Sequence, residues 1–184
     1  MNRMNRTTFS IAQFGTRVGT RAEGETARTE ILRALESLPS DGQLVISLAK
    51  LEVLSGSFAD ESIGKAYQLL LSGLHEDRTM LVETPSIELT EGLDDKLTQR
   101  GLAMLCSHGA GWLVLGQLAA PHRETLSLII NRETTTAREL ADALGILPNA
   151  SHQRLRRLVD LRLILQERTG VLSPGTQYRF HSIL

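Results

Sequence analysis

Short apolar runs alternate with longer amphipathic stretches through the first two thirds of the chain, and this alternation constrains the fold more than any other feature. Three runs, Leu44–Leu48, Thr79–Glu83 and Trp112–Gly116, have the branched, apolar composition of buried central strands. The segment Phe9–Gly15 alternates weakly between apolar and polar residues and predicts a strand that enters the fold. Helical spacing fills the intervals, so the pattern predicts a small layered α/β domain over residues 1–118.

Three helices are expected between these strands. The first runs from Thr26 to Leu38 and ends at a proline. The second begins at Ser57, whose hydroxyl can accept a first-turn amide while Asp60 reaches back to the cap. The third is expected over Leu93–Cys106.

A second module follows the segment 117–123, which contains Pro121 and is interpreted as a linker. Its expected elements are three helices and a β-hairpin whose tip holds Gly170, Pro174 and Gly175. The helices are expected over residues 125–131, 134–146 and 149–161, and the hairpin strands over 164–170 and 177–181. Thr136 and Glu139 form a capping box for the middle helix, and Gly145 ends it.

The two modules differ in charge, although the formal net charge of the 184-residue chain is only -1. From Pro121 onward nine arginines face six acidic residues, whereas eleven basic residues face fifteen acidic ones before it. A global polycation is excluded, so an anionic partner has to be met by a local patch. That patch is expected in the C-terminal module.

The C-terminal module resembles the winged helix-turn-helix regulators of bacteria. The residues that carry the resemblance are TARELADALGI (136–146), RLRRLVDLRLI (154–164), QERTG (166–170) and QYRF (177–180). The resemblance covers the last 60 or so residues, from about 124 to 184, and implies an α+β domain that binds double-stranded DNA. One departure from the family is Arg162, where such proteins commonly have glycine before Leu-Ile.

The third helix of this module is the expected recognition helix, because arginine reads guanine and glutamine reads adenine in the major groove. Bases are expected to be contacted by side chains near its start, and phosphates by its later arginines and the hairpin. The base-contacting residues are then Ser151, His152, Gln153 and Arg154, and the phosphate-contacting residues are Arg156, Arg157 and Arg168. A homodimer is expected from the paired half-sites that such proteins use.

The alternative is an adaptor that binds no DNA. In that case the arginines form an ordinary solvated helix face, and both modules dock protein partners such as a kinase-like ATPase.

The N-terminal module resembles the STAS-like family, distant relatives of anti-anti-sigma factors, through LAKLEVLSGSFADE (48–61), the preceding FGTR and the strand LVIS. In those relatives a kinase partner docks at the loop before the helix and phosphorylates a serine, and Gly56 occupies the place of that serine here. The resemblance implies a partner-binding surface at Ser55, Gly56, Ser57, Phe58 and Asp60. Capping is the preferred interpretation of Ser57, and core packing that of Phe58.

Catalysis, metal binding and membrane insertion find little support in the sequence. The five histidines have no metal-ligand spacing, and the single cysteine, Cys106, has only His108 nearby. No glycine-rich loop is suited to hold a phosphate, and no apolar run reaches the ~18–20 residues that span a bilayer. The expectation is a cytoplasmic protein that is not an enzyme and holds neither cofactor nor metal.

Overall fold

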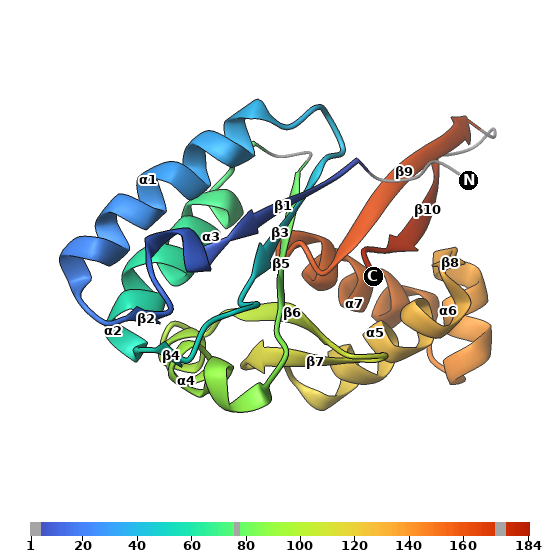
Figure 1. Cartoon of the computed structure of the whole chain (residues 1–184). Helices are drawn as coiled ribbons and strands as arrows, with labels where there is room; N and C mark the ends of the chain where they lie inside the picture. Colours follow the sequence, from blue (N-terminus) through green and yellow to red (C-terminus); the bar gives the residue numbers. More distant parts are fainter. Residues whose placement is uncertain (1–4, 76–77, 172–175) are drawn as a thin grey trace. The chain divides into compact units, whose positions relative to one another are not determined.

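The computed structural model describes residues 5–75, 78–171 and 176–184, which form two compact units, Met1–Gln117 and Leu118–Leu184 (Figure 1). The expected α/β class is confirmed, because a mostly parallel sheet lies at the centre of the first unit. The tip of the expected hairpin, with Pro174 and Gly175, lies outside the described residues.

The central sheet has five strands in the order β1-β3-β5-β6-β7. The first four are parallel, and β7 returns antiparallel along β6. A small second sheet pairs β2 with β4 in parallel. The strands of this unit are β1 (Arg6–Ser10), β2 (Arg17–Val18), β3 (Gln43–Ser47), β4 (Val53–Leu54), β5 (Thr79–Glu83), β6 (Ala103–His108) and β7 (Gly111–Gly116).

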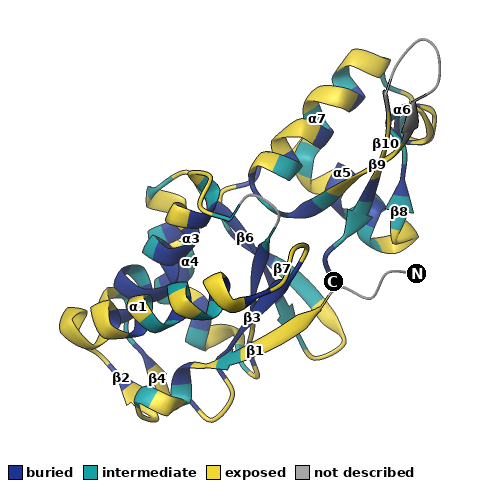
Figure 2. Cartoon of the chain, turned by 90° about the horizontal axis from the view of Figure 1, so that it is seen from above, coloured by how far each residue is buried: buried dark blue, intermediate teal, exposed yellow. Residues whose placement is uncertain are grey.

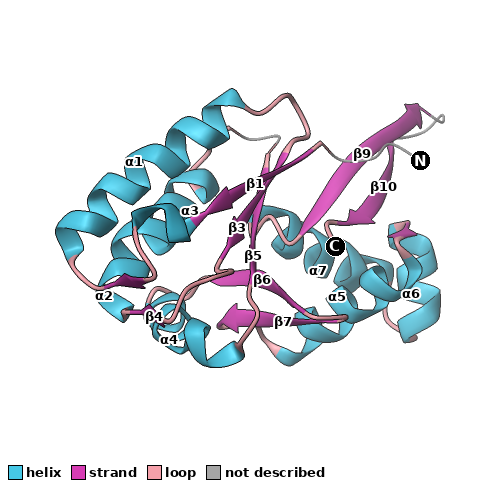
Figure 3. Cartoon of the chain, in the orientation of Figure 1, coloured by secondary structure: helices cyan, strands magenta, loops and turns pink. Residues whose placement is uncertain are grey.

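Helices connect the parallel strands, as parallel pairing requires. They are α1 (Arg21–Ser37), α2 (Gly56–Ala59), α3 (Lys65–Leu71) and α4 (Glu91–Gln99), with short 3-10 turns η1 (Ile11–Phe14) and η3 (Ile87–Thr90). A π-helical segment, η2 (Asp60–Gly64), joins α2 to α3. Figure 3 shows the helices and strands of this unit in alternation along the chain.

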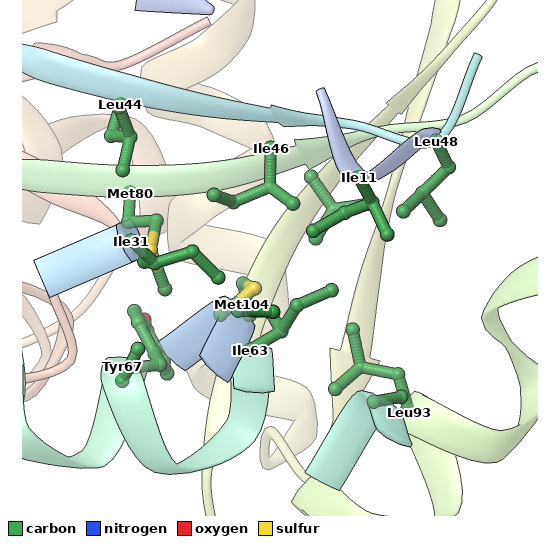
Figure 4. Close-up of a cluster of buried hydrophobic side chains, with 14 of the residues drawn as sticks. Ile11, Ile31, Leu44, Ile46, Leu48, Ile63, Tyr67, Met80, Leu93 and Met104 are labelled. Carbon is green, nitrogen blue, oxygen red and sulfur yellow. The ribbon is translucent and has the colours of Figure 1, made fainter. Parts of the chain in front are cut away.

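The hydrophobic core of the first unit lies between the sheet and these helices (Figure 4). Leu44, Ile46 and Met80 project from β3 and β5 toward Ile31 of α1 and Tyr67 of α3, and all five are fully buried. The hydroxyl of Tyr67 donates to the backbone carbonyl oxygen of Ala103 at 2.8 Å, so the one polar group of this ring is satisfied.

The expected helix over Leu93–Cys106 is confirmed only as far as Gln99, and the rest of that range is wrong. Here α4 ends at Gln99, Gly101 adopts a left-handed φ of 64°, and the chain then forms β6. The amide of Leu102 donates to the Leu97 carbonyl oxygen at 2.9 Å, which ties the turn back onto the helix. Cys106 therefore lies in a buried strand.

The described residues of the second unit, 118–171 and 176–184, form three helices and three strands. They are α5 (Ala120–Arg132), β8 (Thr134–Thr135), α6 (Ala137–Leu144), α7 (Pro148–Asp160), β9 (Ile164–Val171) and β10 (Thr176–Ser182). The strands form an antiparallel sheet in the order β8-β10-β9. Its core draws on every helix and on the hairpin, through Leu126, Ile129, Leu140, Leu155, Leu158, Leu163, Phe180 and Ile183.

The expected linker over residues 117–123 is shorter than predicted: the boundary between the two units falls at Gln117/Leu118, but α5 begins at Ala120. Pro121 lies in the first turn of α5, where its missing N–H and fixed φ fit the start of a helix. By contrast, the expected capping box of α6 is confirmed: the Thr136 hydroxyl accepts from the Glu139 amide at 3.2 Å, and the Glu139 carboxylate accepts from the Thr136 amide at 2.7 Å.

Across the described ranges, no helix combines the length and apolar character that crossing a bilayer would require.

Candidate nucleic-acid interface

The helix α7 follows α6 after a tight turn and packs against both α5 and α6. Gly145 ends α6 with a left-handed φ of 61°, which glycine adopts without steric cost. Pro148 then stands in the first turn of α7. Leu155 and Leu158 face the core, so the opposite side of α7 is left to solvent.

That opposite side carries polar and cationic side chains. Exposed residues are coloured yellow along α7 in Figure 2. His152, Gln153, Arg156 and Arg157 are all exposed, as predicted. Asn149, which the sequence analysis did not select, belongs to the same stripe because it lies four residues before Gln153 and seven before Arg156. Within the described part of the chain, Arg156 and Arg157 form no ion pair. Both guanidinium groups are thus available to an anion.

Ser151 is not part of this stripe, and its prediction as a base contact is wrong. Its side chain is fully buried, and its hydroxyl donates to the Ala137 carbonyl oxygen at 2.6 Å. The bond joins α7 to the start of α6. Ser151 lies on the same helix face as Leu155 and Leu158, and a polar residue on that face has to find an internal partner.

Arg154 also points away from the exposed stripe. Its Nη1 donates to the Glu124 carboxylate at 2.9 Å and to the Pro121 carbonyl oxygen at 3.3 Å, and its side chain is 19% exposed. The predicted base contact of Arg154 is therefore contradicted. The residue ties α7 to the first turns of α5, which sequence spacing could not reveal because Glu124 lies 30 residues away.

His122, which the sequence analysis did not select for this site, lies in the same first turn of α5. Burial lowers its pKa from the ordinary value, and the nearby charges of Arg157 and Arg154 lower the pKa further. Because Arg154 also donates to the carbonyl oxygen of Pro121, the residue before His122, we group His122, Arg154 and Arg157 under the name α5–α7 corner. No local pattern in the sequence predicts this group, because its residues belong to two different helices.

The hairpin adds further cationic side chains. Arg168 on β9 is exposed, as predicted, and pairs in register with Tyr178, which is 39% exposed. Arg179, exposed on β10 and opposite Glu167, was not predicted. Glu167 also contacts the His181 ring at 2.9 Å. Among the described residues of the hairpin, Arg168 has no acidic residue directly opposite, in contrast to Arg179.

The predicted partner surface of the first unit is largely structural. Phe58 is fully buried, and its ring lies 6.4 Å from that of Phe14, so its reading as an exposed partner contact is contradicted. Gly56 faces Gly92 across a close backbone approach, in which a Cβ on Gly92 would come within 2.8 Å of the Gly56 Cα.

The helix cap is Ser55 and not Ser57. The Ser55 hydroxyl accepts from the Phe58 amide at 3.1 Å and donates to the Gly19 carbonyl oxygen at 2.6 Å. Asp60 does not return to a cap, because Arg100 takes both of its oxygens at 2.9 and 3.1 Å. Of the five predicted partner residues, only Ser57 is classed as exposed.

Glu61 is a buried acid that the sequence analysis left without a role. Lys65 donates to its carboxylate at 2.6 Å, and Arg28 donates to the other oxygen. These bonds lower the pKa of Glu61 against the opposing effect of burial. Gly24 of α1 allows the close approach, since a Cβ there would lie 2.9 Å from the Glu61 Cβ. Glu61 thus joins η2 to α1 through its bond with Arg28.

Depressions lie on the first unit, and two of them are lined by residues that the structure describes. One, of about 280 Å³, lies at the carboxyl ends of the parallel strands and is lined by Ala49, Glu83, Thr84, Pro85, Ser107 and Gly109. The other, of about 380 Å³, is lined by residues 51–54, 85–86 and 88–89.

Burial raises the pKa of the Cys106 thiol to about 12, which leaves the thiol protonated at neutral pH. Of the residues that the structure places, no three His, Cys, Asp or Glu side chains are grouped to hold a metal ion.

Comparison with protein-family models, curated proteins and solved structures finds no match for this chain.

Proposed function

We propose that the chain is a DNA-binding transcriptional regulator, in which residues 118–184 form a winged helix-turn-helix and the preceding unit is a STAS-like domain that receives a signal or docks a protein partner. The order of α5, β8, α6, α7, β9 and β10 supports this reading, because a recognition helix after a tight turn and a following hairpin are what such a domain needs.

The observation that carries the proposal is the exposed stripe of α7. Asn149, Gln153 and Arg156 are spaced along one face of the helix, with His152 and Arg157 beside them. Asparagine and glutamine read adenine, and arginine reads guanine. In our proposal His152 joins these three in the major groove, while Arg157 and Arg168 contact the phosphates.

Salt-dependent binding of the full chain to duplex DNA tests the proposal. We expect the affinity to fall with salt, with a log–log slope of about −0.9 for each phosphate neutralised. The double variant Arg156→Ala/Arg157→Ala should weaken binding at least tenfold. If Arg157 neutralises one phosphate, the slope should also become shallower by about 1.

Arg21→Ala/Arg33→Ala is the matched control, because it removes two exposed arginines from α1 of the other unit. It should leave the affinity and the slope unchanged. Equal losses from both double variants would show that net charge alone drives binding. A folded wild-type chain without affinity at any salt concentration would overturn the proposal in favour of the protein-docking adaptor.

The proposal includes a homodimer, since helix-turn-helix proteins commonly bind two half-sites one helical turn apart. Selection of bound fragments from genomic DNA would reveal whether the recovered sites have this two-fold symmetry. Recovered sites with a single half-site would remove the dimer from the proposal.

A further inference from the structure

The α5–α7 corner is the place where Arg154 of α7 reaches the first turn of α5: its Nη1 donates to the carbonyl oxygen of Pro121, the residue before His122, at 3.3 Å. Arg154 and Arg157 lie one turn apart on α7, and His122 comes from the first turn of α5. The corner borders the exposed stripe of α7 through Arg157, which is itself exposed.

The two arginines leave donors unused in this corner. Both bonds of Arg154 start from the same nitrogen, Nη1. Its Nε and Nη2 have no hydrogen-bond partner among the placed residues, and neither does the guanidinium of Arg157. The Glu124 carboxylate therefore orients the Arg154 guanidinium and leaves the Nε and Nη2 donors unoccupied.

The charges around His122 are mostly positive. The charges of Arg157 and Arg154 on α7 both lower the pKa of His122, and the exposed Arg123 follows it on α5. Glu124 is the acid nearest in sequence, and it is already paired with Arg154. An anion in the corner would compensate this excess and would favour the protonated imidazole.

We propose that the α5–α7 corner binds one phosphate group of the DNA backbone between Arg154, Arg157 and His122, and that His122 takes up one proton from solvent as the phosphate arrives. This inference rests on the proposed function and adds a proton-linked contact beside the recognition helix. Free phosphate presents the same chemistry, so the experiment includes it as a separate probe.

The linkage has a definite sign. The protonated imidazole donates to the phosphate, so the pKa of His122 is higher in the complex than in the free chain. Affinity therefore rises as the pH falls through the pKa of the complex, and levels off below the pKa of the free chain. Between these two pKa values the affinity changes by up to tenfold per pH unit.

The first experiment measures the affinity of the full chain for a 30-base-pair duplex between about pH 5.5 and 8, a range that brackets the ordinary histidine pKa. His122→Gln should lose the linked part of the pH dependence and bind several-fold more weakly at the acidic end. His181→Gln, a control on β10 of the same unit, should keep it. An unchanged pH dependence in His122→Gln would overturn the inference.

The second experiment needs no variant. The imidazole of His122 is titrated by NMR in the wild-type chain, free, with the duplex, and with inorganic phosphate. A rise of its pKa with the duplex is the expected result. An equal pKa with and without bound duplex would overturn the inference while leaving DNA binding intact, and a rise with inorganic phosphate alone would assign the corner to a free anion. If no duplex binds at any pH, the proposed function itself has failed.

Discussion

Arg162 adopts a backbone conformation that residues with a side chain rarely take. It follows α7 and its cap with a φ of 54°, in the left-handed region. Its Nε is buried and has no hydrogen-bond partner among the residues described. The backbone amide of Arg162 nevertheless donates to the Val159 carbonyl oxygen at 2.9 Å. This bond stabilises the turn at the end of α7 against the strain at Arg162.

We therefore expect Arg162→Gly to raise the free energy of unfolding of the second unit by about 1 kcal/mol, because glycine removes the left-handed strain. Urea unfolding followed by amide hydrogen exchange of residues 118–184 measures the change. The control Arg156→Gly places the same substitution inside α7 and should lower stability by about 1 kcal/mol. Lower stability in Arg162→Gly would mean that packing of the Arg162 side chain outweighs the strain.

Single residues also show where sequence reasoning succeeds and fails. The absence of glycine at position 162 is visible in the sequence, and the structure places this residue where glycine would be unstrained. The sequence analysis placed the helix cap at Ser57, whereas the chain enters the helix two residues earlier, at Ser55. The partner of Asp60 could not be foreseen, because Arg100 lies 40 residues away.

At the scale of elements, the short helix α6 depends on its N-terminal cap. Hydrogen bonds from the backbone and side chain of Thr136 lower the pKa of Glu139, and the charges of Arg179 and Arg132 add to this. A depressed carboxyl pKa stabilises the folded state above the ordinary glutamate pKa, about 4.3, and this contribution is lost as the pH falls through the folded-state pKa.

Thr136→Ala is expected to lower the free energy of unfolding of the second unit by about 1 kcal/mol at pH 7, because it removes the cap acceptor. Glu139→Gln should cost less at pH 7 and should flatten the loss of stability between about pH 5 and 3. The urea midpoints of the wild-type chain, Thr136→Ala and Glu139→Gln, measured at about pH 7 and about pH 3, test these expectations. A wild-type and a Glu139→Gln chain with the same acid sensitivity would contradict the assignment.

Helices and strands could be predicted where the segment has a clear hydrophobic periodicity and a residue that ends it. The central strands β3 and β5 and the helices α6 and α7 meet this condition. The pair α4 and β6 does not, because the apolar residues after Gly101 continue the spacing of the helix before it. Pro121 was read as a break, yet the same residue is favoured in a first helical turn, and only the tertiary contacts of α5 decide between the two.

At the scale of the whole molecule, the two units have separate hydrophobic cores. The core cluster of the first unit draws its buried members from Ile11 to Leu115, and the buried side chains of the second lie on α5, α6, α7 and the hairpin. The charge difference follows the same boundary, since the arginine-rich sequence belongs to the second unit. A core substitution should therefore act mainly on the unit that contains it.

Ile46→Ala in β3 and Leu158→Ala in α7 test this separation, because both side chains are fully buried. Each should lower the stability of its own unit by about 2–5 kcal/mol. Amide hydrogen exchange should show that Ile46→Ala lowers the protection of residues 5–117 with little change in α5–α7. Leu158→Ala should do the reverse.

DNA affinity should then fall in Leu158→Ala and persist in Ile46→Ala, since all residues of the proposed interface belong to the second unit. Loss of protection in both units from either substitution would mean that the chain unfolds as one cooperative body.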